Sequence, residues 1–125
     1  MIIHKSAEDY LEMILMLKEE KGYVRSIDIA QGLGVSKPSV SVAMKQLREN
    51  GYIRMDQDNF IHLTDPGYEI AHRMLVRHKT LTTLLMKLGV NEKDAREDAC
   101  KIEHDISPAT FDALVKLLDS RSDQN

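Results

Sequence analysis

Apolar side chains recur at helical spacing along most of the chain. In residues 6–20 they lie three and four positions apart, which predicts an amphipathic helix that ends before Gly22. The same spacing, behind residues that favour helix starts, predicts five further helices. These begin near Ser26, Ser36, Thr64, Asn91 and Ser107, and those from Thr64 and Asn91 would run to about residues 87 and 104.

Two short runs of strand-forming residues interrupt this pattern. Residues 52–55 and 60–63 flank the polar stretch Asp56-Gln57-Asp58-Asn59, so they predict a β-hairpin. Residues 26–63 therefore read as helix, glycine-containing turn, helix and hairpin, which is the order of a winged helix-turn-helix. We predict a mainly α fold, with an N-terminal winged helix-turn-helix at residues 1–64 followed by an α-helical domain at residues 65–125.

The second helix of this motif would enter the major groove of double-stranded DNA. It carries basic and hydroxyl side chains between apolar ones, and a basic residue precedes the first helix of the motif, where a phosphate could bind. The candidate DNA contacts are Arg25, Ser26, Lys37, Pro38, Ser39, Ser41 and Lys45. The plain alternative is that these side chains only form the solvated face of a helix.

Charge changes this picture in two places. The net charge of −3 argues weakly against a nucleic-acid partner, yet residues 36–54 carry four basic side chains and a single acidic one. The location of charge decides a nucleic-acid footprint better than its total. The predicted hairpin tip instead carries Asp56 and Asp58, which phosphates would repel.

Composition fits one ordinary globular domain, or two small ones that share a core. Of the 125 residues, 42% are hydrophobic and 30% charged, and aromatic residues are few, which favours packed helices. The single cysteine, Cys100, excludes an internal disulfide and fits a reducing cytoplasm. We find no signal peptide and no apolar run that could span a membrane, so we expect a cytoplasmic protein.

Side chains that bind metals recur with helical spacing. Two carboxylates near the start of the chain lie three residues apart, and a later thiol, carboxylate and imidazole are spaced so that they can project from one side of a helix. Such groups are ligands for divalent transition metals. Taken singly, each has an ordinary explanation, because acids favour helix starts, histidines favour helix ends, and a lone cysteine is often buried. One histidine, His78, lies between these two groups in the sequence. The candidate metal ligands are therefore Asp9, Glu12, His78, Cys100, Glu103 and His104.

Five stretches carry a more specific signal. They are Ser6-Ala7-Glu8-Asp9-Tyr10-Leu11-Glu12, Ile29-Ala30 with Val35-Ser36-Lys37-Pro38-Ser39-Val40, Leu63-Thr64-Asp65-Pro66-Gly67, Arg77-His78, and Ile102-Glu103-His104-Asp105-Ile106-Ser107. Together they resemble the metal-dependent repressors of the diphtheria-toxin-repressor family over about residues 6–118. The chain ends where some members continue into an SH3-like domain, so it is similar to the short two-domain branch that includes the manganese transport regulators.

The resemblance implies that all six candidate side chains are metal ligands, but it describes a hybrid site. The position of Asp9 holds Asp in manganese regulators and Met in iron regulators, whereas the position of Cys100 holds Glu in the manganese branch and Cys in the iron branch. Mn(II) prefers oxygen ligands, and a thiolate favours Fe(II), Co(II), Ni(II) or Zn(II). We expect a divalent transition metal, with Mn(II) or Fe(II) ahead of Co(II), Ni(II) and Zn(II). Glu97 and His72 are less favoured substitutes for a lost carboxylate ligand.

The resemblance further implies a homodimeric, metal-activated repressor of manganese or iron uptake genes. Residues 65–125 would bind metal and dimerise, with the dimer built by residues 78–118. Metal would fix the spacing of two recognition helices for successive major grooves of a palindromic operator, about 34–36 Å apart.

Two other classes of protein remain open. One is a metal-independent winged-helix regulator that senses oxidation through Cys100 or binds a small ligand. The other is a metal-dependent hydrolase, since carboxylates and histidines near a metal can activate water. We do not expect an enzyme, because no nucleophile or base motif stands apart from the proposed ligands.

Overall fold

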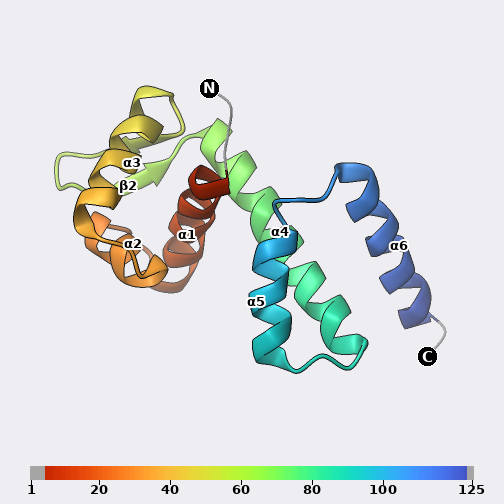
Figure 1. The fold of residues 1–125 in the computed structure, drawn as a ribbon. Helices are drawn as coiled ribbons and strands as arrows, with labels where there is room; N and C mark the ends of the chain where they lie inside the picture. The colour runs from red at the N-terminus through yellow and green to blue at the C-terminus, as the bar shows by residue number, and fades with distance from the viewer. Residues whose placement is uncertain (1–4, 124–125) are drawn as a thin grey trace. The chain divides into compact units, whose positions relative to one another are not determined.

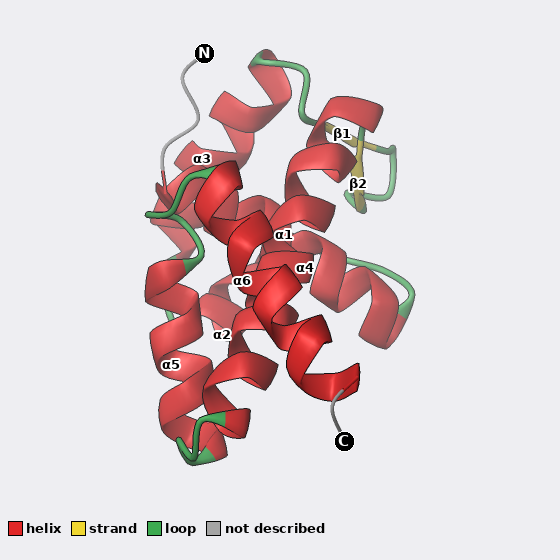
Figure 2. Cartoon of the chain, turned by 90° about the vertical axis from the view of Figure 1, so that its right-hand side faces the viewer, coloured by secondary structure: helices red, strands yellow, loops and turns green. Residues whose placement is uncertain are grey.

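The computed structural model describes residues 5–123 and is mainly helical, which confirms the predicted fold class (Figure 1, Figure 2). The chain forms two compact units that divide within one long helix, the first up to Leu75 and the second from Val76. None of the helices in the described part of the chain has the length and apolar character that a membrane crossing needs. The helices and strands are α1 (Lys5–Lys21), α2 (Ser26–Leu33), α3 (Lys37–Glu49), β1 (Ile53–Met55), β2 (Ile61–Leu63), α4 (Asp65–Lys87), α5 (Glu92–Ile102) and α6 (Pro108–Asp123).

The core of the first unit lies where α1 packs against α2, α3 and β2. The apolar positions that predicted the helices supply it, because residues three and four apart share one helical face. Burying these aliphatic side chains is the main favourable term for a small helical unit. The largest fully buried side chains of this core are Leu11, Ile14, Val24, Ile29, Val40, Leu47 and Ile61.

Local hydrogen bonds set the helix starts of the first unit. Ser36 Oγ accepts from the backbone N–H of Ser39 at 3.2 Å, so Ser36 is the N-cap that the sequence predicts for α3. The sequence predicts Ser26 as the N-cap of α2, but in the structure Arg25 holds the cap position and Ser26 is the first helical residue. Asp28 Oδ2 accepts from the Arg25 N–H at 2.9 Å, and this bond holds the pKa of Asp28 below its usual range.

The hairpin is antiparallel, with Ile53 opposite Leu63. Its acidic tip is organised by one carboxylate: Asp56 Oδ1 accepts from the backbone N–H groups of Asp58 and Phe60, at 2.9 and 3.0 Å. The other oxygen, Oδ2, lies 2.8 Å from His62 Nε2. An aspartate at this place is therefore explained by the geometry of the turn.

The second unit contains the end of α4 with α5 and α6. Leu81 and Leu84 of α4 and Ala95 and Ala99 of α5 are its buried apolar side chains. Asn91 Oδ1 accepts from the Asp94 N–H at 2.9 Å, which confirms Asn91 as the cap of α5. This helix ends at Ile102 rather than at about residue 104, so its last two predicted residues lie in the turn that follows.

Candidate metal centre

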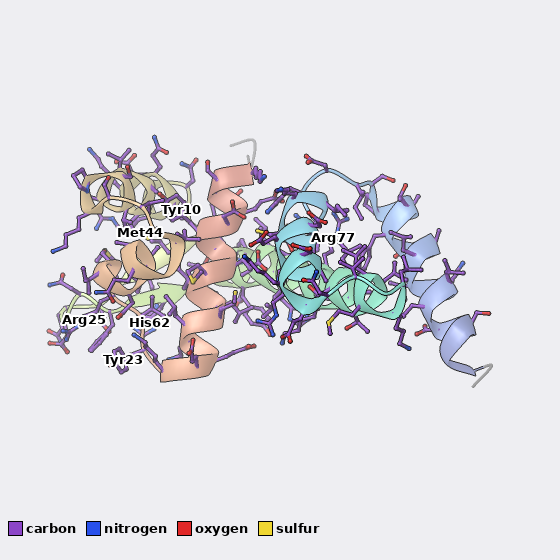
Figure 3. The ribbon with its side chains drawn as sticks, turned by 60° about the horizontal axis from the view of Figure 1, so that its bottom comes forward. Tyr10, Tyr23, Arg25, Met44, His62 and Arg77 are labelled. Atoms are coloured by element: carbon purple, nitrogen blue, oxygen red, sulfur yellow. The ribbon has the colours of Figure 1, made fainter. Side chains whose placement is uncertain are left out.

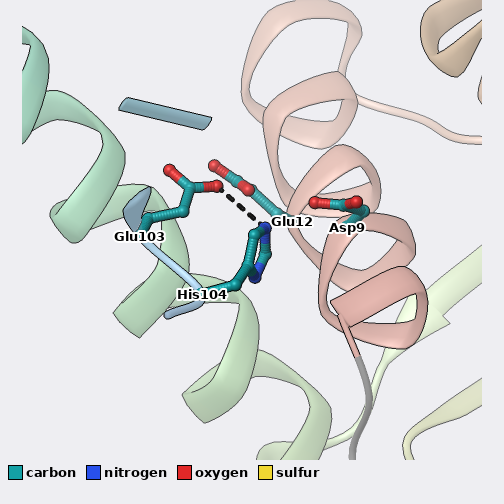
Figure 4. A group of neighbouring side chains, drawn as sticks. All are labelled: Asp9, Glu12, Glu103 and His104. Carbon is teal, nitrogen blue, oxygen red and sulfur yellow. Dashed lines mark ion pairs between the residues drawn. The ribbon is translucent and has the colours of Figure 1, made fainter. Parts of the chain in front are cut away.

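Asp9 and Glu12 lie one helical turn apart on α1, as their spacing predicts (Figure 4). Asp9 is half-buried, and Glu12 keeps only 6% of its surface exposed. Glutamate is rarely buried to this extent unless a positive group compensates it. The neighbouring Glu8 forms a 3.6 Å ion pair with Arg73, so its carboxylate has a structural partner of its own.

Glu103 is the most buried charged residue of the second unit, with no exposed surface. Its Oε2 lies 3.0 Å from His78 Nδ1, and its Oε1 lies 3.3 Å from His104 Nε2. Oε1 accepts no hydrogen bond from any of residues 5–123. A buried carboxylate between two imidazoles, with one oxygen short of a donor, is the chemistry of a metal site, because a divalent cation would offset the cost of burying the charge.

Arg77 supports the turn that carries Glu103 and His104 (Figure 3). Its Nη1 donates to the carbonyl oxygens of Glu103 and Ile106, at 3.0 and 3.1 Å, and its guanidinium lies 5.4 Å from the ring centroid of Phe111. These carbonyls follow the end of α5, where helix carbonyls have no partner within the helix. Arg77 therefore fixes the backbone of the candidate ligands. The helical spacing that identifies the candidate ligands does not identify Arg77 as a functional residue. Its position next to His78 was the one signal in the sequence that pointed to it.

The remaining candidates differ in their surroundings. Cys100 is an exposed thiol on α5, one turn before Glu103. The expectation that His104 shares its helical face is wrong, because α5 ends at Ile102 and His104 lies in the turn. Glu97 and His72, the less favoured substitutes, are both exposed. Glu103 and His104 belong to the turn after α5, whereas Asp9 and Glu12 project from α1 (Figure 4). Carboxylates and imidazoles are donors that suit Mn(II) and Fe(II).

The predicted DNA-reading helix has one buried and one exposed face. Val40, Met44 and Leu47 are buried in the core, whereas the predicted contacts on α3 are all exposed. A recognition helix needs this division, since one face must anchor it and the other must reach the groove. The exposed set is Lys37, Pro38, Ser39, Ser41 and Lys45.

Arg25 is held beside the hairpin, at the start of α2 (Figure 3). Its guanidinium lies 4.4 Å from the ring centroid of Phe60, and Tyr23 meets the same ring edge-on, with centroids 5.8 Å apart. Both contacts orient the segment before α2. Ser26, the other candidate of this segment, is half-buried.

Comparison with known proteins accounts for both units. The family model "Iron dependent repressor, N-terminal DNA binding domain" matches residues 3–59, and "Iron dependent repressor, metal binding and dimerisation domain" matches residues 64–124. The chain belongs to the iron-dependent repressor family. The resemblance drawn from the sequence is thereby confirmed, and the protein is a metal-dependent, DNA-binding transcriptional regulator with a divalent transition metal as cofactor.

Relatives within this family extend over most of the chain. The HTH-type transcriptional regulator MntR of Geobacillus thermodenitrificans is 37% identical over 113 residues, which cover 90% of this chain and 80% of that protein. Transcriptional regulator MntR of Salmonella typhimurium is 38% identical over 108 residues, covering 86% and 69%. A regulator of Methanocaldococcus jannaschii, MJ0568, is 34% identical over 122 residues, covering 96% and 98%.

Solved structures agree with the fold. The crystal structure of T. acidophilum IdeR aligns with a TM-score of 0.81 at 27% identity and covers 95% of this chain. A manganese-dependent transcriptional repressor in complex with manganese aligns with a TM-score of 0.80 at 29% identity and covers 90%. This chain spans 55% and 52% of those two chains, about half their length.

Proposed function

We propose that this protein is a manganese-responsive repressor that binds operator DNA as a homodimer and controls genes of metal-ion homeostasis. The observation that carries the proposal is the buried carboxylate of Glu103, held between His78 and His104 in a unit whose family model is a metal-binding and dimerisation domain. Manganese is favoured over iron because the carboxylates outnumber the thiol and because relatives are named as manganese regulators.

The proposed ligands come from both compact units. Asp9 and Glu12 would be contributed by the DNA-binding unit, and His78, Glu103 and His104 by the second unit, with Cys100 as the sixth candidate. A metal held by both groups binds one arrangement of the units better than others, and it shifts the population toward that arrangement. The ion supplies charge compensation and fixed geometry, while Arg77 holds the turn that presents two of its ligands.

The proposed operator is palindromic double-stranded DNA, because a two-fold dimer presents two equivalent recognition helices. The exposed residues of α3, Lys37, Pro38, Ser39, Ser41 and Lys45, would contact base edges and phosphates, and Arg25 and Ser26 would contact a phosphate near the start of α2. We place the protein in the cytoplasm with its DNA, and we propose no catalytic reaction. The alternative of a metal-independent sensor built on Cys100 is not favoured, because the second unit matches a metal-binding domain.

The test is fluorescence anisotropy of a labelled palindromic operator with apo protein, titrated anaerobically with Mn(II), Fe(II), Co(II) and Zn(II). We expect operator binding to appear only with metal. We expect Mn(II) to activate this binding at concentrations within its cellular range. Glu103→Gln should weaken Mn(II) binding at least about tenfold, since even changes around metal ligands cost this much. Asp98→Asn, which changes an exposed acid on α5 that is not among the candidate ligands, is the matched control.

Two outcomes would contradict parts of the proposal, and a third would assign a role to Cys100. Equal operator binding in the presence of a chelator would remove the metal switch and leave a metal-independent winged-helix protein. A Cys100→Ser protein that responds more strongly to Mn(II) and less to Fe(II) would show that the thiol sets metal preference, and an unchanged response would remove Cys100 from the ligand set.

A further inference from the structure

The first compact unit contains a cavity of about 310 Å³ that the metal and DNA sites do not use. It lies among α1, the hairpin and the first turns of α4, and all of its lining residues belong to this unit. Its volume falls within the range of small-molecule binding sites in proteins, about 300–1,000 Å³. It opens to solvent on the side of Arg54 and Tyr68, which are both exposed, so a ligand can enter it from the surface.

The interior of the cavity is aliphatic. Ile14 and Leu15 of α1 and Ile61 of β2 form part of the lining, and each is at most 5% exposed, so their side chains are fixed by the surrounding core. Leu63 and the half-exposed ring of Tyr68 complete the apolar lining. A rigid apolar surface of this kind binds a hydrocarbon or aromatic group, because the group leaves water without the protein having to rearrange.

Apart from the hydroxyl group of Tyr68, the polar side chains that line the cavity are basic. Lys18 and His62 already have partners: Lys18 Nζ donates to the Gly22 carbonyl at 2.8 Å, and His62 pairs with Asp56 at 2.8 Å. Arg54, on β1, is exposed, and within residues 5–123 no carboxylate lies at ion-pair distance from its guanidinium. A guanidinium offers two parallel N–H donors that match a carboxylate. Arg54 is therefore the group that an incoming anion would meet.

We propose that this cavity binds a small monocarboxylic acid with an apolar chain, whose carboxylate pairs with Arg54 and whose chain lies against Ile14, Leu15 and Ile61. Basic residues on the lining with no acidic one among them select an anion, and the aliphatic interior selects an apolar body. The proposal goes beyond the metal-dependent repressor function and does not depend on it, since no proposed metal ligand or DNA contact lines the cavity.

The test compares decanoate with 1-decanol, which has the same chain length and no charge, by isothermal titration calorimetry on the full chain. We expect one decanoate site per chain, with 1-decanol bound at least tenfold more weakly. Arg54→Gln should reduce decanoate affinity to that of 1-decanol and leave 1-decanol unchanged. Arg48→Gln is the matched control, because Arg48 is an exposed arginine of the same unit that does not line the cavity.

A second variant tests the apolar part of the site. Leu63→Trp fills the cavity from its half-buried wall and should abolish binding of both ligands in a protein that circular dichroism shows to be folded. The proposal is overturned if Arg54→Gln binds decanoate as the unchanged chain does, if folded Leu63→Trp retains decanoate binding, or if neither ligand binds the unchanged chain.

Discussion

Arg77 makes more contacts that hold the second unit together than its place in a basic stretch of the sequence suggests. It is 7% exposed, donates two hydrogen bonds to backbone carbonyls 26 and 29 residues later, and lies over the ring of Phe111. Hydrogen bonds from a charged donor to buried acceptors are among the stronger ones. The guanidinium therefore ties α4 to the turn after α5 and to α6.

Replacing Arg77 by Met should destabilise the protein by about 1–3 kcal/mol, since two carbonyls lose their donor while the apolar length of the side chain is kept. Urea unfolding followed by circular dichroism measures this. The control is Arg73→Met on the same helix, whose 3.6 Å ion pair with Glu8 is half-exposed on the arginine side and should contribute less than about 1 kcal/mol. Equal losses of unfolding free energy for both variants would mean that the buried hydrogen bonds of Arg77 contribute no more to stability than the ion pair of Arg73.

Asp56 shows why an acid stands at the hairpin tip. The hydrogen bond from His62 is the main cause that holds its pKa below the usual range, and the N–H groups of Phe60 and Asp58 add to it. A carboxyl whose pKa is lower in the folded state stabilises the fold above its ordinary pKa, about 3.9, and loses this contribution as the pH falls through the folded value.

We therefore expect the free energy of unfolding of Asp56→Asn to depend less steeply on pH below about pH 4 than that of the unchanged chain. Urea unfolding at several pH values between 3 and 6 measures the two slopes. Asp58→Asn, a neighbouring exposed acid, should keep the steeper dependence. Parallel curves for all three proteins would show that the turn does not need the charge of Asp56.

At the scale of elements, helix starts could be predicted and some helix ends could not. Ser36 and Asn91 cap α3 and α5 through residues three positions away, so the signal is local. The end of α5 depends on Arg77, which is distant in sequence, and no local pattern encodes it. The start of α2 was misplaced by one residue because Asp28, rather than Ser26, provides the capping hydrogen bond.

The hairpin and α4 are joined at a close backbone contact. A side chain at Gly67 would clash with the carbonyl oxygen of Tyr52, which is backbone and cannot move aside easily. Thr64 adds two hydrogen bonds at this contact. Its Oγ1 donates to the Gly51 carbonyl at 2.6 Å, and its N–H donates to the Tyr52 carbonyl at 3.1 Å. The first turn of α4 and the end of the hairpin are thus one packed structure.

Gly67→Ala should cost about 1–3 kcal/mol of stability, because the added methyl group forces the backbone apart, although alanine is the better helix former. Thermal unfolding by calorimetry measures the loss. Glu69→Ala, an exposed position on the same helix, should change stability by less than about 0.5 kcal/mol. An increase in stability for Gly67→Ala would show that helix propensity outweighs the clash.

At the scale of the whole molecule, the distribution of charge matters more than its sum. The net charge of −3 coexists with a basic α3 and with Arg25 at the start of α2.

The candidate metal ligands show how far the sequence alone predicts the site. Their residue types and spacing could be predicted together with the family, whereas the burial of Glu103 and its place between two histidines arise from contacts between distant parts of the chain.

The ring of Phe60 should matter for DNA binding if Arg25 contacts a phosphate as proposed. Phe60→Leu removes the surface on which the guanidinium rests and should weaken operator and non-specific DNA alike. Arg25→Gln should do the same and reduce the slope of log affinity against log salt by about one. Anisotropy at several salt concentrations with Mn(II) present measures both. Loss of operator binding alone would indicate a base contact, and no change in either would remove Arg25 from the interface.

The way the hairpin is bordered has a consequence for self-association. An exposed strand edge offers unpaired N–H and C=O groups to other chains and is a common route to aggregation. Here each strand has only three residues, the Val24 carbonyl accepts from the Ile61 N–H at 2.8 Å beside β2, and β1 carries the charged Arg54. A sheet this short, bordered on one side and charged on the other, offers a neighbouring molecule almost no backbone groups for strand pairing. The hairpin can therefore stay exposed without promoting aggregation through its edges.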